Sequence, residues 1–205
     1  MAAAAPVAQS CAQSMSDPRH PQRRKEPPVD HPTPSTSQRA ASYAQRFSEI
    51  NADVLATIEP LDDAQWFALC KAEQATVAAV VSHVAGSYRA IGGWIAAVAA
   101  GETPPPVTRE MIDAGNARHA ERHAQRPKAE ALDAVRTNAA ATAAMVRGLG
   151  DEQLARSAYL QQFGRSMTVA ELIEDVLLQH VVEHLGSIRA TLADVPAVQS
   201  NDGQS

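Results

Sequence analysis

The sequence is poor in the residues that build β-sheets and disulfide scaffolds. Aromatic residues make up only 4% of its 205 residues, whereas alanine, the best helix former, makes up about a fifth of them. Its two cysteines, Cys11 and Cys70, are too few for a disulfide framework. We find no alternation of apolar and polar residues that would indicate a strand. The composition therefore predicts an all-α protein and argues against a β-sandwich or a β-barrel.

Long apolar runs and an excess of basic charge are also missing. There is no uncharged apolar stretch of roughly 18 residues or more, so we expect no membrane span. The apolar N-terminus lacks a preceding basic region and is broken by Pro6, so we expect no secretory signal. A formal net charge of −5 gives no general reason to expect nucleic acid as a partner. These absences predict a cytoplasmic protein with neither membrane nor nucleic-acid partners.

The two ends of the chain differ in composition from its middle. Residues 1–36 carry seven of the 13 prolines, together with many serine, glutamine and arginine residues. Such a segment cannot bury enough apolar surface to offset the entropy lost on ordering. We therefore predict disordered tails at 1–36 and 196–205 and one folded domain at 37–195. The sequence does not decide between Met1 and Met15 as the start of the chain.

Four helical blocks fill the predicted domain. Apolar side chains recur every three or four residues through 38–59 and 76–100. A third block, 108–150, is split at Pro127, which suits the first position of a helix. The fourth, 168–194, opens with T-V-A-E, which matches a capping box. Helices of about 20 residues with one apolar face bury that face best against one another, so we predict an antiparallel four-helix bundle.

Histidine is the residue type whose number stands out, with seven copies. In the fourth block, His180 lies within the inward apolar stripe and His184 lies four residues later, at the edge of that stripe. Two imidazoles at this spacing point the same way and suit one metal ion. His83 lies at the flank of the apolar stripe of the second block. Bundles build metal sites from inward side chains on facing helices. The residues alone leave two interpretations open, a metal site of these three histidines or hydrogen-bonded histidines of the core.

The remaining histidines carry weaker indications. His20 and His31 lie in the predicted N-terminal tail. His119 and His123 repeat the four-residue spacing, but their surroundings, N-A-R-H-A-E-R-H, are strongly polar. That favours a solvated or helix-contacting role, although a role in a metal site stays open. Glu183 could orient a ligand imidazole through a hydrogen bond, and an exposed, ion-paired Glu183 is the alternative.

Three short motifs occur in order along the chain, namely T-V-A-A-V-V-S-H-V-A at 76–85, I-D-A-G-N at 112–116, and T-V-A-E-L followed by H-V-V-E-H-L-G-S-I-R within 168–189. Together they resemble motifs of the DinB/YfiT-like family. The first is similar to the start of the family's second helix, the second to a D-x-x-N turn at the start of its third helix, and the third to its last helix. The resemblance spans about residues 40–193. It departs at Ala75, where the family often has a tryptophan, and this leaves a local packing or pocket feature in doubt.

The resemblance implies a fold, a metal and a chemistry. The family folds as an antiparallel four-helix bundle in an up-down-down-up arrangement. It binds a divalent metal, often zinc or nickel with iron or manganese as alternatives, through positions that match His83, His180 and His184. Characterised members include isomerases and S-transferases that use mycothiol, bacillithiol or glutathione. We therefore expect a metal-dependent thiol transferase or isomerase that acts on a small electrophile, with a low-molecular-weight thiol as a second cofactor.

Two other functions remain open at this point. A non-enzymatic bundle would bind a metal or a small ligand, or form a structural dimer. A metal-dependent hydrolase would use the same three histidines and differ only in its pocket. An alanine-rich helix face left over after the bundle has packed favours self-association, and we expect a homodimer.

Overall fold

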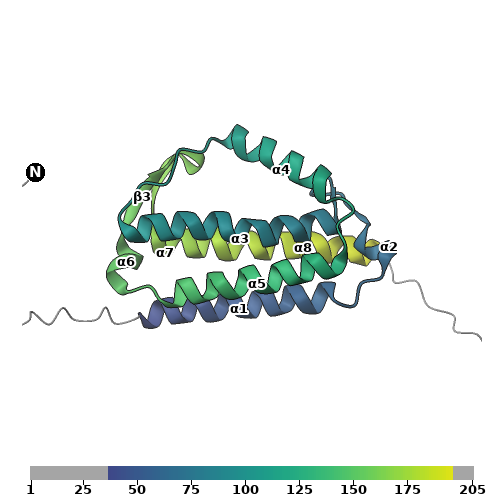
Figure 1. The fold of residues 1–205 in the computed structure, drawn as a ribbon, viewed down its shortest axis with the longest axis horizontal. Helices are drawn as coiled ribbons and strands as arrows, with labels where there is room; N and C mark the ends of the chain where they lie inside the picture. Colours follow the sequence, from purple (N-terminus) through teal and green to yellow (C-terminus); the bar gives the residue numbers. More distant parts are fainter. Residues whose placement is uncertain (1–36, 196–205) are drawn as a thin grey trace, which may run out of the picture. The chain divides into compact units, whose positions relative to one another are not determined.

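Four long helices form a bundle in the computed structural model, which describes residues 37–195 (Figure 1). The first and last helices run in one direction and the two others in the opposite direction, so the order is up-down-down-up (Figure 1). The predicted all-α class and four-helix bundle are confirmed. The predicted tails and the choice of starting methionine lie outside the described residues. The helices are α1 (Gln38–Ile58), α3 (Val77–Ala100), α5 (Lys128–Arg147) and a last helix made of α7 (Val169–Glu171), a π-helical segment (Leu172–Leu178) and α8 (Gln179–Asp194).

The helices begin and end at the local signals in the sequence. The Thr76 side chain accepts a hydrogen bond from the first turn of α3, and Gly101 ends that helix with a left-handed φ of +85°. The capping box forms as predicted. Thr168 Oγ1 accepts from the Glu171 amide at 3.1 Å, and the Glu171 carboxylate accepts from the Thr168 amide at 2.7 Å. Pro127 is the N-cap of α5 and not the first residue of the helix, which was the position predicted for it.

The core between the helices contains one polar pair among its apolar side chains. Phe47 and Tyr88 meet edge to face, with ring centroids 5.1 Å apart. The buried Tyr88 hydroxyl donates a hydrogen bond of 2.6 Å to Asn51 Oδ1, and the Asn51 amide donates to the Phe47 carbonyl at 2.7 Å. The buried polar side chains of Asn51 and Tyr88 therefore satisfy each other across α1 and α3. Among residues 37–195, no helix combines the length and the apolar character that a membrane crossing requires.

Two short antiparallel hairpins close the ends of the bundle, although the sequence shows no strand pattern. Two of the strands have only two residues, and the four-residue strands S-A-Y-L and R-S-M-T do not alternate between apolar and polar residues, which is why the pattern did not reveal them. Each hairpin follows a short helix, and a 3₁₀ turn at Gln161–Phe163 joins the strands of the second. The elements are α2 (Asp63–Trp66) with β1 (Leu69–Cys70) and β2 (Ala75–Thr76), and α6 (Asp151–Ala155) with β3 (Ser157–Leu160) and β4 (Arg165–Thr168).

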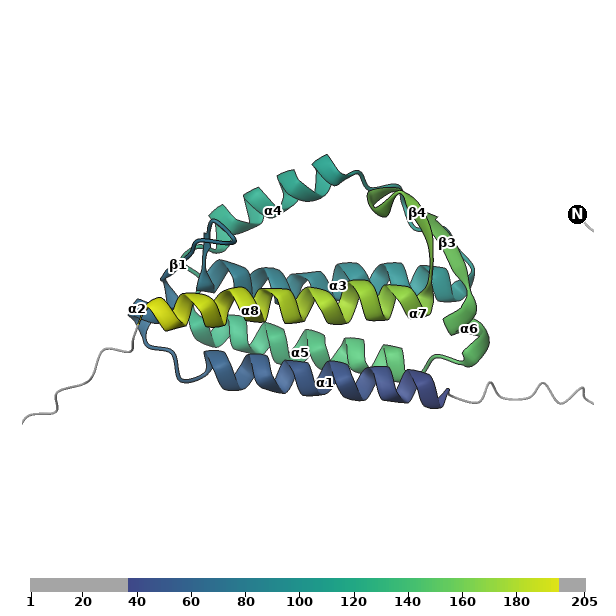
Figure 2. The ribbon, with the colours of Figure 1, turned by 180° about the vertical axis from the view of Figure 1, so that it is seen from behind.

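Helix α4 (Arg109–His123) crosses over the bundle instead of extending its third helix (Figures 1 and 2). Because α3 and α5 run in the same direction, the chain must return to its starting end between them, and α4 makes that return. None of its side chains is buried. Its C-terminal end is held by two hydrogen bonds of 2.9 Å, from Thr76 Oγ1 to the Ala124 carbonyl and from the Trp66 indole to the Arg126 carbonyl.

Candidate metal centre and cleft

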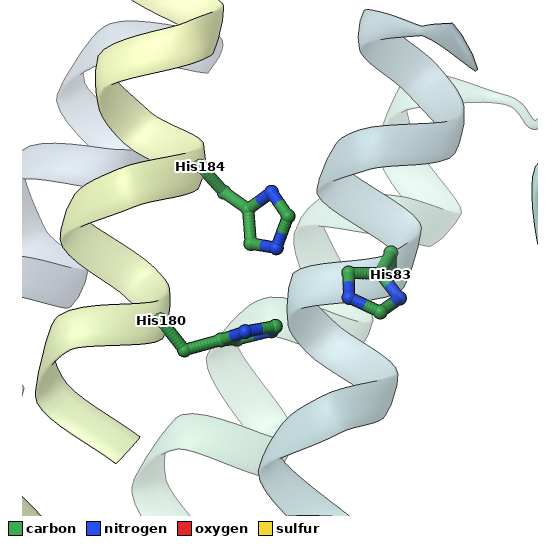
Figure 3. Close-up of side chains that lie close together, drawn as sticks. All are labelled: His83, His180 and His184. Atoms are coloured by element: carbon green, nitrogen blue, oxygen red, sulfur yellow. The ribbon is translucent and has the colours of Figure 1, made fainter. Parts of the chain in front are cut away.

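Three imidazoles from two neighbouring helices converge in the bundle (Figure 3). His83 comes from α3, and His180 and His184 come from α8. One nitrogen of each ring lies within 4.8 Å of the corresponding nitrogen of the other two. The ring centroids are 5.1 Å apart for His83 and His180, 4.9 Å for His83 and His184, and 4.4 Å for His180 and His184. The structure therefore brings together the three histidines that the sequence singled out.

The direction of the α8 histidines depends on the π-helical segment just before them. A π-helix bonds residue i to residue i+5, so each residue turns the chain by less than it does in an α-helix. The seven residues Leu172–Leu178 therefore rotate α8 relative to a regular helix that starts at the Thr168 capping box. A constant turn of about 100° per residue does not describe this helix. Short π-helical segments of this kind are frequent at functional sites.

Burial keeps His83 and His180 in the neutral form that binds metal ions. Desolvation, followed by the neighbouring imidazoles of His184 and His119, lowers the pKa of His83 to about 4. Desolvation, followed by His184 and His83, lowers the pKa of His180 to about 3. Nε2 of His180 is buried and has no hydrogen-bond partner. Because buried polar atoms are normally satisfied, this unpartnered nitrogen fits a missing ligand such as a metal ion.

Glu73 contacts the histidine group from the turn of the β1–β2 hairpin. Its Oε1 lies 2.8 Å from Nδ1 of His184. When Nδ1 donates to this carboxylate, Nε2 of the same ring is left free, which is the arrangement typical of a metal-bound histidine. The sequence offered no sign of this residue, because 111 positions separate it from His184 and a turn has no periodic pattern. A carboxylate shortly before the second helix is the only signal that could have pointed to it.

Glu183, the residue considered from the sequence as an orienting group, points elsewhere in this structure. It is exposed on α8, and its carboxylate accepts a hydrogen bond of 3.1 Å from the Gln179 side chain. This is a contact between neighbouring turns on the outer face of the helix. Glu73 therefore makes the contact with a site imidazole that Glu183 was considered for.

The second histidine pair reaches the site through one of its members. The ring centroid of His119 lies 5.8 Å from that of His83 and 4.2 Å from that of His123. Burial, followed by His123 and then by the charge of Arg122, lowers the pKa of His119. Burial, followed by the charges of Arg126 and Arg122, lowers the pKa of His123. The prediction favoured a solvated or helix-contacting role for both residues, whereas His119 faces the histidine group.

A cleft of about 580 Å³ leads away from the histidine group beneath α4. Its lining combines the three histidines with apolar side chains of α3, α4 and the turn between β3 and β4. Trp94 and Phe163 meet edge to face in it, with ring centroids 6.1 Å apart. Trp94 lies about three helical turns along α3 from His83. A cleft of this volume, with a few polar groups and apolar walls, suits a small molecule.

Polar side chains also line the cleft along α4. Asn116 borders both this cleft and a smaller cavity of about 80 Å³ that touches Glu73 and His184. Arg109 and Asp113 lie nearer the start of α4, with Arg109 Nε 4.0 Å from Asp113 Oδ1. The D-x-x-N segment of the third sequence block therefore contributes to the cleft as well as to the helix.

Comparisons with known proteins agree with this architecture. Residues 46–188 match the model of the DinB superfamily. No curated protein matches the chain. Among solved structures, YfiT from Bacillus subtilis, described as "a probable metal-dependent hydrolase with an unusual four-helix bundle topology", is similar with a TM-score of 0.66 and 18% identity, over 82% of this chain and 94% of its own. The structural likeness shows a shared fold, and the family match establishes that the chain belongs to the DinB superfamily.

Proposed function

We propose that the protein is a metal-dependent enzyme that acts on a small electrophile. It would either transfer a thiol to this electrophile or isomerise the electrophile. The observation that carries the proposal is the convergence of His83, His180 and His184, whose all-nitrogen set suits one divalent ion such as zinc or nickel. Three protein ligands leave coordination positions open, which distinguishes catalytic from structural sites. A bound ion would supply a Lewis acid at which a low-molecular-weight thiol loses its proton and becomes a nucleophile.

The residues of the chain would position the reactants around this centre. Glu73 holds the His184 ring in one orientation through the 2.8 Å hydrogen bond. The apolar walls at Trp94 and Phe163 would bind the body of the electrophile and exclude water from it. Asn116 lines the same cleft, and its amide would donate to a carbonyl or carboxylate oxygen of the substrate. Together these groups would hold an electrophile beside the position of the thiol.

A thiol requires less activation than water to become a nucleophile, because water is a far weaker acid. A bound divalent ion lowers the pKa of water to about 7, and a hydrolase can add a general base to assist its deprotonation. Two carboxylates border the cavities at the site within residues 37–195. Glu73 is engaged with His184, and Asp113 is exposed on α4 with its Oδ1 4.0 Å from Nε of Arg109. A metal-dependent hydrolase using the same three histidines is the second candidate, and the description of the similar YfiT structure favours it.

Metal content is the first test of the proposal. We expect the purified protein to carry about one equivalent of a divalent metal after growth with zinc, nickel, iron and manganese supplied together. His180→Ala should lose that metal, because two imidazoles bind it far more weakly than three. His123→Ala is the matched control, since it removes an imidazole from outside the group, and it should retain the metal. A wild-type protein without bound metal would overturn the enzymatic proposal.

Activity with defined reagents then separates the two chemistries. Wild type and His184→Ala would be incubated with 1-chloro-2,4-dinitrobenzene and, in turn, glutathione, bacillithiol and mycothiol. We expect faster conjugation by the wild type with at least one thiol. Hydrolysis of p-nitrophenyl acetate without any thiol, at a rate that His184→Ala abolishes, together with no conjugation, would favour the hydrolase instead.

A further inference from the structure

Two buried side-chain nitrogens lack a hydrogen-bond partner within residues 37–195, and only one of them belongs to the histidine group. They are Nε2 of His180 and Nε2 of His119. Leaving a buried polar atom without a partner costs free energy of about 1–3 kcal/mol, so such atoms are uncommon and require an explanation. A metal held by the three histidines explains His180. It leaves His119 unexplained.

His119 faces the histidine group from the opposite wall of the cleft. It lies on α4, whereas the three grouped histidines lie on α3 and α8. It lines the cleft of about 580 Å³ and also the smaller cavity that borders Glu73 and His184. Its ring meets that of His83 at an interplanar angle of 76°. The side chain is therefore in contact with the space that a substrate would occupy.

The backbone around His119 is anchored to the bundle. On α3, Gly86 lies next to the ring, and a Cβ at that residue would be 3.8 Å from His119 Cε1. The end of α4 just after His119 is fixed by the hydrogen bonds that Thr76 and Trp66 donate to the carbonyls of Ala124 and Arg126. The imidazole is thus carried on a helix end that the bundle holds in place.

His119 is not one of the mutually close ligands. The group whose nitrogens all lie within 4.8 Å of one another, among the described histidines, cysteines and carboxylates, consists of His83, His180 and His184. A fourth protein ligand would fill a coordination position that a catalytic site leaves open. A hydrogen-bonding group that lies just beyond the open coordination position instead contacts the molecule that occupies this position. A neutral imidazole has one donor and one acceptor nitrogen and can serve either kind of ligand atom.

We propose that His119 is a ligand-binding residue of the site, and that its Nε2 hydrogen-bonds to the thiol or substrate held next to the three-histidine centre. The inference rests on the proposed function, because it assumes that this centre holds a divalent ion. It assigns the inner face of α4 to recognition of the exogenous molecule. Asn116, one turn earlier on α4, lines the same two cavities and extends this polar wall.

Binding of a simple thiol to the cobalt(II)-loaded protein tests the inference without an unknown substrate. The visible absorption of cobalt(II) would report metal uptake first and then titration with 2-mercaptoethanol. His119→Phe keeps a ring of similar size but removes the hydrogen bond, and we expect it to weaken thiol binding about tenfold. His119→Gln retains a hydrogen-bonding group and should recover most of the affinity. Cobalt(II) affinity should be unchanged in both variants.

His123→Phe is the matched control, because it makes the same change one turn further along α4, outside both cavities, and its thiol affinity should equal that of the wild type. If His119→Phe does not fold, His119→Ala gives the same comparison in a helix none of whose residues belongs to the buried core. Wild-type thiol affinity in the folded His119 variants would overturn the inference alone. A loss of cobalt(II) from them, as in His83→Ala, would also overturn it by making His119 a metal ligand. Wild-type protein that takes up no cobalt(II) would overturn the proposed function together with the inference.

Discussion

Glu73 and His184 form a 2.8 Å contact between residues that are 111 positions apart in the sequence. The contact joins the β1–β2 hairpin at one end of the bundle to the helix that carries two of the three grouped histidines. Both side chains are mostly buried, with exposed fractions of 23% for Glu73 and 16% for His184. A hydrogen bond shielded from water to this degree restrains an imidazole more firmly than an exposed one does.

Removing the Glu73 carboxylate should weaken metal binding while leaving the fold intact. Outer partners of metal-bound histidines typically contribute about 10–100-fold to metal affinity, and we expect a loss of that size in Glu73→Gln. Competition with a coloured chelator measures the affinity directly. Glu183→Gln is the matched control, because Glu183 is exposed and bonded to Gln179, and its affinity should equal that of the wild type. A larger loss in Glu183→Gln than in Glu73→Gln would show that the contact has been assigned to the wrong carboxylate.

The metal-free protein should become less stable as the pH falls below neutrality. The folded state lowers the pKa values of His83 and His180 to about 4 and about 3, from a reference value of 6.5. Between pH 6.5 and 4 the unfolded chain therefore takes up protons that the folded chain does not, and the free energy of unfolding decreases. The loss should be roughly 2 kcal/mol for each imidazole at pH 5 and should level off below about pH 3.

Urea unfolding in the presence of a chelator, at pH 7, 6 and 5, measures this dependence. In the double variant His83→Gln/His180→Gln the two imidazoles are gone, and the fall in stability over this range should be smaller. An equal fall in the variant and the wild type would place the pH dependence in other groups.

Truncating the buried hydroxyl of Tyr88 should destabilise the bundle. Tyr88→Phe removes the donor to Asn51 Oδ1 and leaves that oxygen unpartnered in the core. We expect a decrease of about 1–3 kcal/mol in the free energy of unfolding. Tyr159, which is 58% exposed, provides the control, because Tyr159→Phe should change stability very little. Similar effects of the two substitutions would contradict the role of the Tyr88–Asn51 pair.

Gly93 in α3 and Gly101, which follows the last residue of that helix, should respond to alanine in opposite directions. Gly101 has a φ of +85°, so Gly101→Ala forces a side chain into the left-handed region and should destabilise by about 1 kcal/mol. Gly93 lies in the helix interior with open space where its Cβ would be, and Gly93→Ala should stabilise by about 0.5–1 kcal/mol. Melting temperatures compared with the wild type reveal the two signs, and a loss in Gly93→Ala would indicate an unrecognised contact.

Local signals explain which parts of the structure the sequence could predict. The limits of α3 follow from Thr76 and Gly101, whose effects on the backbone act within one helical turn. The pairing of His180 with His184 follows from the helical repeat alone. The contact of Glu73 and the inward position of His119 depend on how distant elements pack, and no pattern within a short window encodes such contacts. The hairpins were missed for a related reason, since two of their strands have only two residues and the other two do not alternate between apolar and polar residues.

Helix α4 lines the cleft without contributing to the buried core of the bundle. The helices that carry the grouped histidines are tied to the core on their other faces, so substitutions there alter folding and chemistry together. None of the 15 residues of α4 belongs to the buried core, and substitutions outside a core usually have little effect on stability. The wall of the cleft can thus diversify while the centre beneath it stays constant. Substitutions on this one helix can therefore change what the cleft accommodates while the core of the bundle stays the same.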